Sequence, residues 1–119
     1  MIEKKVKIPI YYGDLIIIKC DDWEEVNKKY KTKAEKTFEA IVFKYDTKKG
    51  YTKYVAAFSK KPTGATIAHE VTHLVNHIFI DRVMQLDPYN DEPQAYLTGW
   101  FFEQIDNFFK SKKAKKWVS

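Results

Sequence analysis

The chain has 119 residues, a length typical of one compact domain. Apolar residues make up 45% of it and aromatic residues 16%, which is enough for a folded core and excludes a largely disordered chain. Cys20 is the one cysteine, so no disulfide can form within the chain. The N-terminus has no continuous apolar stretch, and no apolar run approaches the length of a membrane span. We therefore expect a cytoplasmic protein without a signal peptide or membrane segment.

The net charge is +5, from 21 basic and 16 acidic residues, and much of the excess lies near the two ends. Lys4, Lys5 and Lys7 stand at one end, and a basic tail that we expect to fray occupies 110–119 at the other. We interpret these lysines as solvated surface. The alternative is a weak attraction to nucleic acid or another acidic partner. Nucleic acid is not the expected partner, because no repeated Cys/His finger and no RNP-like strand is present.

The first elements are predicted from alternation of apolar and polar residues. Strand spacing is seen at three apolar positions, Val6, Ile8 and Ile10. A turn at 12–14 and an apolar run at 15–18 complete a β-hairpin. Asp21 or Asp22 can cap a short helix that ends near Tyr30.

A second hairpin and two longer helices follow. The segments 38–45 and 51–58 are rich in aromatic and β-branched residues, with a glycine in the turn between them. Helical spacing runs from about 65 to 84, with its apolar face at Ile67, Val71, Leu74 and Ile78. A last helix, capped by Asn90 or Asp91, reaches about residue 109, and its apolar face is formed by Leu97, Phe101, Ile105 and Phe108. The order predicts an α+β domain, with helices on a small antiparallel or mixed sheet of about four strands.

The first long helix contains the pattern HExxH, in the sequence Ala68-His69-Glu70-Val71-Thr72-His73. Residues four apart lie about 40° apart around a helix and one turn along it, so His69 and His73 can reach one point. Neutral imidazole is a good ligand for Zn²⁺. Glu70 lies beside these ligands, where it can hold a metal-bound water and accept its proton as a general base.

Two less specific interpretations of these histidines remain open. The stripe of His69 and His73 points away from the apolar face of its helix, as two solvated surface histidines also would. His77 lies two turns beyond His69, about 12 Å along the axis. We therefore expect His77 beside the site or at the surface rather than as a ligand of the same metal.

Zn²⁺ at a catalytic site needs a third protein ligand and one open position. The downstream carboxylates are Asp87, Glu92 and Glu103. Glu92 fits best, because it begins the last helix after a loop that can return the chain toward His73. Its alternative role is that of a first-turn acid that interacts with the helix dipole. Glu92 shares one stripe with Tyr96, Gly99 and Glu103, and Gly99 would let two helices approach closely.

Together these residues resemble the gluzincin metallopeptidases, in which HExxH is followed by a glutamate ligand on a later helix. The same stretch, with Asn90-Asp91-Glu92-Pro93-Gln94-Ala95-Tyr96-Leu97, is similar to small phage-encoded metallopeptidase-like proteins. The resemblance covers about residues 65–105. It implies one zincin-like domain over 1–119, in the host cytosol if a phage encodes it. The edge strand of its sheet, at 52–59, would align an extended peptide.

The resemblance implies a zinc-dependent metallopeptidase-like hydrolase. A metal-bound water would attack a peptide or amide carbonyl of a peptide or protein substrate, with Zn²⁺ on His69, His73 and Glu92. Tyr96 stands where larger gluzincins have a second acid, and it can instead act in catalysis by stabilising the oxyanion. Little more than 20 residues follow Ala95, so a shallow cleft is expected. The alternatives are a non-catalytic zincin-fold binding module that engages a host protein, a purely structural metal, and no metal.

Overall fold

A computed structural model of the chain describes residues 1–111. Its elements are β1 (Ile2–Lys7), β2 (Asp14–Lys19), α1 (Trp23–Tyr30), β3 (Ala40–Asp46), β4 (Thr52–Phe58), α2 (Gly64–Asp81) and α3 (Glu92–Lys110). This order and the α+β class are the ones predicted from the sequence. None of the helices among residues 1–111 combines the length and apolarity needed to cross a membrane. Most of the predicted basic tail lies outside the described residues.

The four strands form one mixed sheet in the order β1-β2-β4-β3. β1 pairs with β2 and β3 pairs with β4 in antiparallel fashion, as the two predicted hairpins require. The hairpins are joined through their second strands, because β2 and β4 lie side by side and parallel. The two central strands are therefore β2 and β4, and β1 and β3 are the edges.

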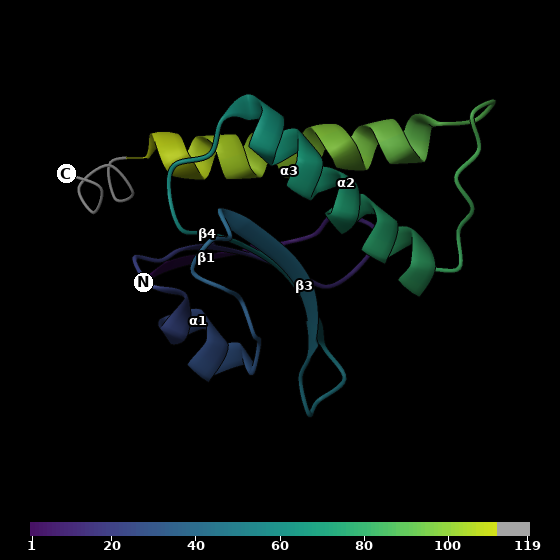
Figure 1. Ribbon diagram of the computed structural model, residues 1–119. Helices are drawn as coiled ribbons and strands as arrows, with labels where there is room; N and C mark the ends of the chain where they lie inside the picture. The colour runs from purple at the N-terminus through teal and green to yellow at the C-terminus, as the bar shows by residue number, and fades with distance from the viewer. Residues whose placement is uncertain (112–119) are drawn as a thin grey trace.

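The sheet lies between two helical layers, with α1 on one face and α2 and α3 on the other (Figure 1). Successive residues of β2 point to opposite faces. Leu15 and Ile17 pack in the core with α2 and α3, whereas Ile16 and Ile18 pack in a second cluster with α1. Burial on both faces explains why β2 and β4 are almost continuously apolar. Each fully buried aliphatic side chain contributes about 1.5–3 kcal/mol.

The prediction that residues 52–59 form the edge strand is wrong. β4 occupies this segment and is paired on both sides, and Val55 to Phe58 are fully buried. The edge strand beside α2 is β3, whose second half places Lys44 and Asp46 in solvent. A strand with polar residues tolerates an edge position, whereas an apolar run such as Tyr54-Val55-Ala56-Ala57-Phe58 is stabilised by neighbours on both sides.

The first strand is shorter than its apolar spacing predicts. β1 ends at Lys7, and Ile10 turns with a φ of 69° and a side chain that is mostly exposed. Gly13 closes the turn with a φ of 91°, which favours glycine. A Cβ at Gly13 would lie 2.8 Å from Cε2 of Tyr54, so the close approach of the turn to β4 also requires glycine.

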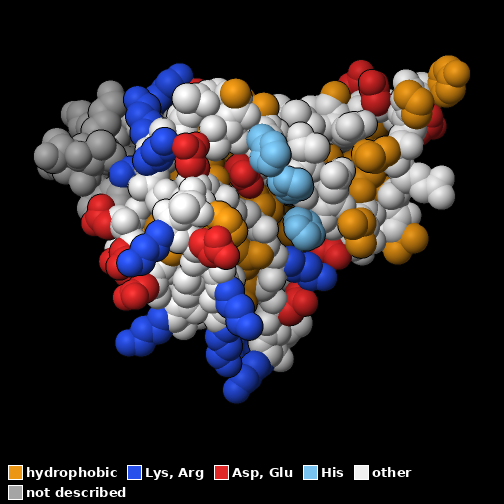
Figure 2. Space-filling model, viewed as in Figure 1, with side chains coloured by type: hydrophobic (Ala, Val, Ile, Leu, Met, Phe, Trp, Pro, Cys, Tyr) orange, Lys and Arg blue, Asp and Glu red, His pale blue; other side chains and the backbone are white. Residues whose placement is uncertain are grey.

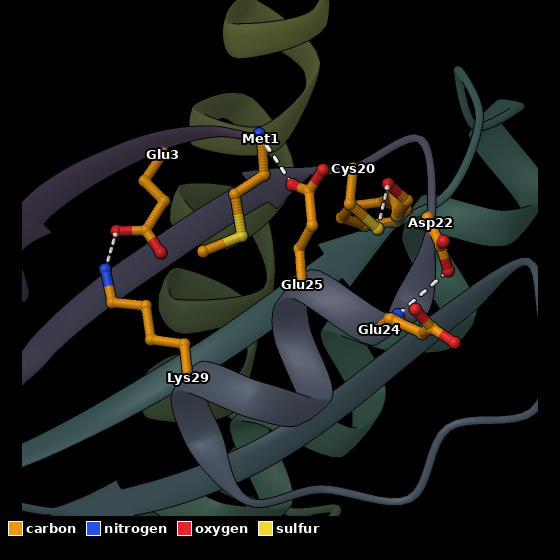
Figure 3. Close-up of polar contacts among 8 residues, drawn as sticks. Met1, Glu3, Cys20, Asp22, Glu24, Glu25 and Lys29 are labelled. Carbon is orange, nitrogen blue, oxygen red and sulfur yellow. Dashed lines mark hydrogen bonds and ion pairs between the residues drawn. The ribbon is translucent and has the colours of Figure 1, made fainter.

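Polar contacts fasten α1 to the rest of the domain (Figure 3). The side chain of Asp22 accepts a hydrogen bond from the backbone N–H of Glu24 at 2.9 Å, the cap expected from the sequence. The N-terminal ammonium group pairs with Glu25 at 2.7 Å, and Lys29 pairs with Glu3 at 2.8 Å. These contacts hold α1 over one end of its face of the sheet.

The C-terminal end of α2 is anchored to the sheet by Asp81. The Tyr54 hydroxyl donates to Asp81 Oδ2 at 2.6 Å, and Lys44 donates to Oδ1 at 3.1 Å. Burial alone would raise the pKa of Asp81, but these two donors outweigh it and lower that pKa. The anchor places the end of α2 beside Lys44, the residue of β3 that follows its apolar half.

Candidate metal centre

The histidines of the HExxH pattern lie together on α2. Nε2 of His69 and Nε2 of His73 are 3.3 Å apart, and the two rings meet edge to face. Two nitrogen ligands about 2.0–2.1 Å from a tetrahedral Zn²⁺ are separated by about 3.3–3.4 Å. The separation of the two nitrogens therefore matches that of two ligands of a tetrahedral zinc site. The same distance also allows a weak hydrogen bond between neutral rings, if one Nε2 carries a proton.

The position of the histidines follows from the amphipathic pattern of α2. The predicted apolar face of this helix is buried, at Ile67, Val71, Leu74 and Ile78. His69 and His73 fall on the opposite side and are exposed. Figure 2 shows the histidine side chains in one row on this surface of the molecule. An accessible pair of imidazoles is what a metal from solution requires.

Glu70 lies between the apolar face and the histidine row. Its side chain is only 7% exposed, although it is charged in its ordinary state. Burial raises the pKa of Glu70, and His69 and His73 oppose this shift when they carry charge. A carboxylate with a raised pKa can exchange a proton closer to neutral pH, as a general base and acid must.

A cleft of about 410 Å³ opens beside these residues. One wall comes from the segment at the start of β3, and the other from the first half of α2. The lining residues are Phe38, Glu39, Ala40, Ala65, Thr66, His69 and Glu70. Because β3 is the edge strand, the cleft combines an imidazole, a buried carboxylate and a strand edge that no other strand covers.

Glu39 is a titratable residue of this cleft that the sequence pattern did not indicate. Its carboxylate pairs with Lys60 at 2.8 Å, and both side chains are mostly exposed. Nothing in the local pattern distinguishes Glu39 from other acids that precede a strand. Only the assignment of β3 to the edge would have placed Phe38, Glu39 and Ala40 beside the helix.

The stripe on α3 that carries Glu92 is not brought to the histidines. Glu92, Tyr96, Gly99 and Glu103 are all exposed, whereas the opposite face of α3 is buried. Within residues 1–111, no three His, Cys, Asp or Glu side chains are placed to hold one metal ion. The role of Glu92 as third ligand stays a prediction, as does the role of Tyr96.

The expectation that Gly99 allows close helix packing is wrong. A Cβ at Gly99 would meet no atom within 4 Å, so this position faces solvent. α2 and α3 instead meet through the apolar face of α3, and a Cβ at Gly64 would lie 3.9 Å from Cζ of Phe102. The stripe pattern identified a real helix face but not the direction in which that face points.

His77 continues the row of His69 and His73 and is half-buried. Burial lowers the pKa of His77, Asp81 opposes this effect, and His73 adds to it. His77 therefore favours the neutral imidazole, one helical turn from each of these two neighbours. This placement beside the histidine pair agrees with the position expected for it.

The features that bear on function are the histidine pair, the buried Glu70 and the cleft beside the edge strand. Comparisons of the chain with models of protein families, with curated proteins and with solved structures found no match. A function must therefore be derived from the distances, burial and charges around His69, Glu70 and His73.

Proposed function

We propose that the protein is a zinc-dependent metallopeptidase-like hydrolase, with His69 and His73 as ligands and Glu70 as general base. The observation that carries this proposal is the 3.3 Å separation of the two Nε2 atoms, next to a buried carboxylate on the same helix. Zn²⁺ held there would polarise a carbonyl and activate water for attack on it. A peptide or protein substrate in the cytoplasm, which is the host cytosol if a phage encodes the protein, is part of the proposal.

Glu70 moves the proton in this mechanism. Its carboxylate takes a proton from the attacking water and passes it to the leaving amine. Burial supports this role, because a pKa raised toward neutrality makes both transfers accessible. The helix holds Glu70 between His69 and the sheet, so the carboxylate faces the cleft rather than bulk solvent.

The edge of β3 supports an extended substrate. A peptide that adds to this edge uses backbone hydrogen bonds and runs past the cleft in which His69 and Glu70 lie. Exposed Phe38 offers an apolar surface for one substrate side chain. The groove is shallow, which favours short or unfolded peptides.

Glu92 is the third ligand in this proposal, on the sequence pattern alone. Because α3 begins at Glu92, the preceding connection at 82–91 would have to bring the start of the helix toward His73. Tyr96 would move with Glu92, since it lies one turn later on the same face. The proposal therefore expects a structural difference near the start of α3 between the zinc-bound and zinc-free protein.

Zinc content and peptide hydrolysis test the proposal together. Purified wild type and Glu70→Gln should each bind about one equivalent of Zn²⁺, and only the wild type should cleave a library of quenched fluorescent peptides. Loss of a general base lowers the rate by about 10²- to 10⁴-fold. Wild-type cleavage that is unchanged in Glu70→Gln, or a wild type without bound zinc after zinc addition, would overturn it.

One observation favours the non-catalytic binding module as a second candidate. Residues 1–111 contain no third ligand in place, as a protein that retained a zincin-like fold without turnover would show. This alternative expects the zinc-loaded wild type to cleave no peptide of the library. It also expects wild type and Glu70→Gln to be identical in every binding measurement.

A further inference from the structure

A second cavity lies at the opposite end of the β3–β4 hairpin from the histidines. The cleft that His69 and Glu70 line adjoins Ala40, which pairs with Phe58. The second cavity adjoins the hairpin turn. Strands of this length separate the two by about 20 Å. The second cavity has a volume of about 480 Å³ and is called the lysine cavity below; its lining residues are Lys5, Asp14, Thr47, Lys48, Lys49, Tyr51 and Lys53.

Four lysines from three parts of the chain meet in the lysine cavity. Lys5 comes from β1 and Lys53 from β4, on either side of the central strand β2 and on the face that α1 covers only in part. Lys48 and Lys49 come from the hairpin turn. Figure 2 shows Lys and Arg side chains gathered at the tip of the molecule where this hairpin ends in Figure 1.

None of these four lysines forms an ion pair with a carboxylate among residues 1–111. The cations that do form ion pairs there include the N-terminus, Lys29, Lys44, Lys60 and Lys110. Asp14 is the one carboxylate that lines the lysine cavity. The cavity therefore carries an excess of positive charge that attracts an anion.

Tyr51 gives the lysine cavity an exposed aromatic surface. Its side chain is 65% exposed, although an aromatic ring gains stability from burial. The backbone N–H of Tyr51 donates to the Thr47 hydroxyl at 3.2 Å, and the Thr47 N–H donates to the Tyr51 carbonyl at 2.8 Å. The turn therefore fixes the backbone that carries the ring at the rim of the cationic cavity.

We propose that the lysine cavity binds single-stranded nucleic acid. Phosphates contact the lysines and one unpaired base stacks on Tyr51, the combination by which proteins hold single strands. Asp14 repels phosphate but accepts hydrogen bonds from the amino group of a base such as cytosine. A duplex fits less well, because its bases are already stacked. The proposal departs from the sequence-based expectation, since the sequence could not show that Lys5 and Lys53 join the turn lysines.

The test is the binding of a fluorescent deoxycytidine oligomer of about 12 nucleotides, measured by anisotropy. Four phosphate contacts predict a slope near −2.8 for the logarithm of the binding constant against the logarithm of the salt concentration. Affinity should therefore fall about 50-fold between 50 and 200 mM salt. Lys48→Ala combined with Lys49→Ala should reduce that fall to about 7-fold. Tyr51→Ala should weaken binding about 5- to 150-fold, and Tyr51→Phe should restore it.

The matched control is Lys60→Ala combined with Lys61→Ala. These neighbouring lysines follow the other end of β4, outside the lysine cavity. Their replacement should therefore leave binding of the oligomer unchanged. His69→Ala should also bind the oligomer normally, so failure of the zinc proposal would be seen separately. The proposal would be overturned if the oligomer did not bind at 50 mM salt, or if the two double lysine variants lost equal affinity. It would also be overturned if polyphosphate or a duplex bound tightly and Tyr51→Ala did not weaken that binding.

Discussion

The two long helices, α2 and α3, differ in what their exposed faces contact. They have 18 and 19 residues, and both bury an apolar face in the same core. On α2, His69 of the histidine row lines the cleft beside the edge strand. On α3, the stripe that carries Glu92 lies in solvent, away from that cleft. A helical pattern thus predicts which residues share a face, whereas the packing of the helix decides what that face meets.

The largest expected effect is on zinc affinity, at the exposed histidines of α2. The binding free energy of a zinc site with four ligands is about 10–16 kcal/mol. If the ligands contribute equally, loss of one of them weakens binding about 100- to 1,000-fold. His69→Ala and His73→Ala should each show this loss in competition with a chromophoric chelator. His77→Ala should not, because His77 lies one turn beyond the pair.

The same titration separates the two carboxylates that compete for the third position. Glu92→Gln should weaken zinc binding like a histidine variant, and Glu39→Gln is its matched control in the cleft. The opposite ranking would refute Glu92 as a ligand and show that the third ligand comes from the start of β3.

Neighbouring residues of α3 test the direction in which its faces point. Leu97 is fully buried, and Leu97→Ala should lower the free energy of unfolding by about 2–5 kcal/mol. Tyr96 is 44% exposed, and Tyr96→Ala should change it by no more than about 0.5 kcal/mol. Urea denaturation measures both. A large loss for Tyr96→Ala would mean that its stripe packs against protein.

The C-terminal ends of α2 and α3 differ in the burial of the ion pairs that they carry. The pH dependence of the free energy of unfolding should show this difference. Asp81 of α2 accepts from Tyr54 and Lys44, and Asp81→Asn should cost about 1.5–3 kcal/mol at pH 7. The folded pKa of Asp81 is lowered, so its contribution is present above the unfolded pKa and disappears as pH falls through the folded pKa. The gap between wild type and variant in urea denaturation should therefore narrow as pH falls below the ordinary pKa of an aspartate carboxyl.

Asp106 of α3 supplies the control for Asp81. It pairs with Lys110 at 2.7 Å across one turn, and the side chain of Asp106 is 34% exposed, against 14% for Asp81. Asp106→Asn should cost no more than about 0.5 kcal/mol at pH 7. Equal losses from the two variants would argue against a special anchor at the end of α2.

Two glycines give the smallest predicted effect and differ in its sign. Gly99 lies in an exposed helical position with open space around it, so Gly99→Ala should stabilise the protein by about 0.5–1 kcal/mol. Gly13→Ala should destabilise it, because of the positive φ and the nearby Tyr54 ring. Thermal denaturation measures both shifts. If Gly99→Ala destabilised the protein, Gly99 would lie in a close helix contact after all, as the sequence predicted.

The sequence by itself determined the order of the elements, the apolar faces of α2 and α3, and the meeting of His69 with His73. These features depend on backbone hydrogen bonds and on side chains within a few residues of each other. The HExxH spacing places two imidazoles together in any regular helix, whatever the rest of the chain does.

The tertiary structure alone decided that β3 rather than β4 is the edge strand, that Glu39 lines the cleft, and that Glu92 faces solvent. It also brought Lys5 and Lys53 to the hairpin turn. These placements depend on how all the apolar faces are buried at once, and the connection at 82–91 does not specify the direction of α3. Positions far apart in the chain are related through the shared core, so no local pattern contains them.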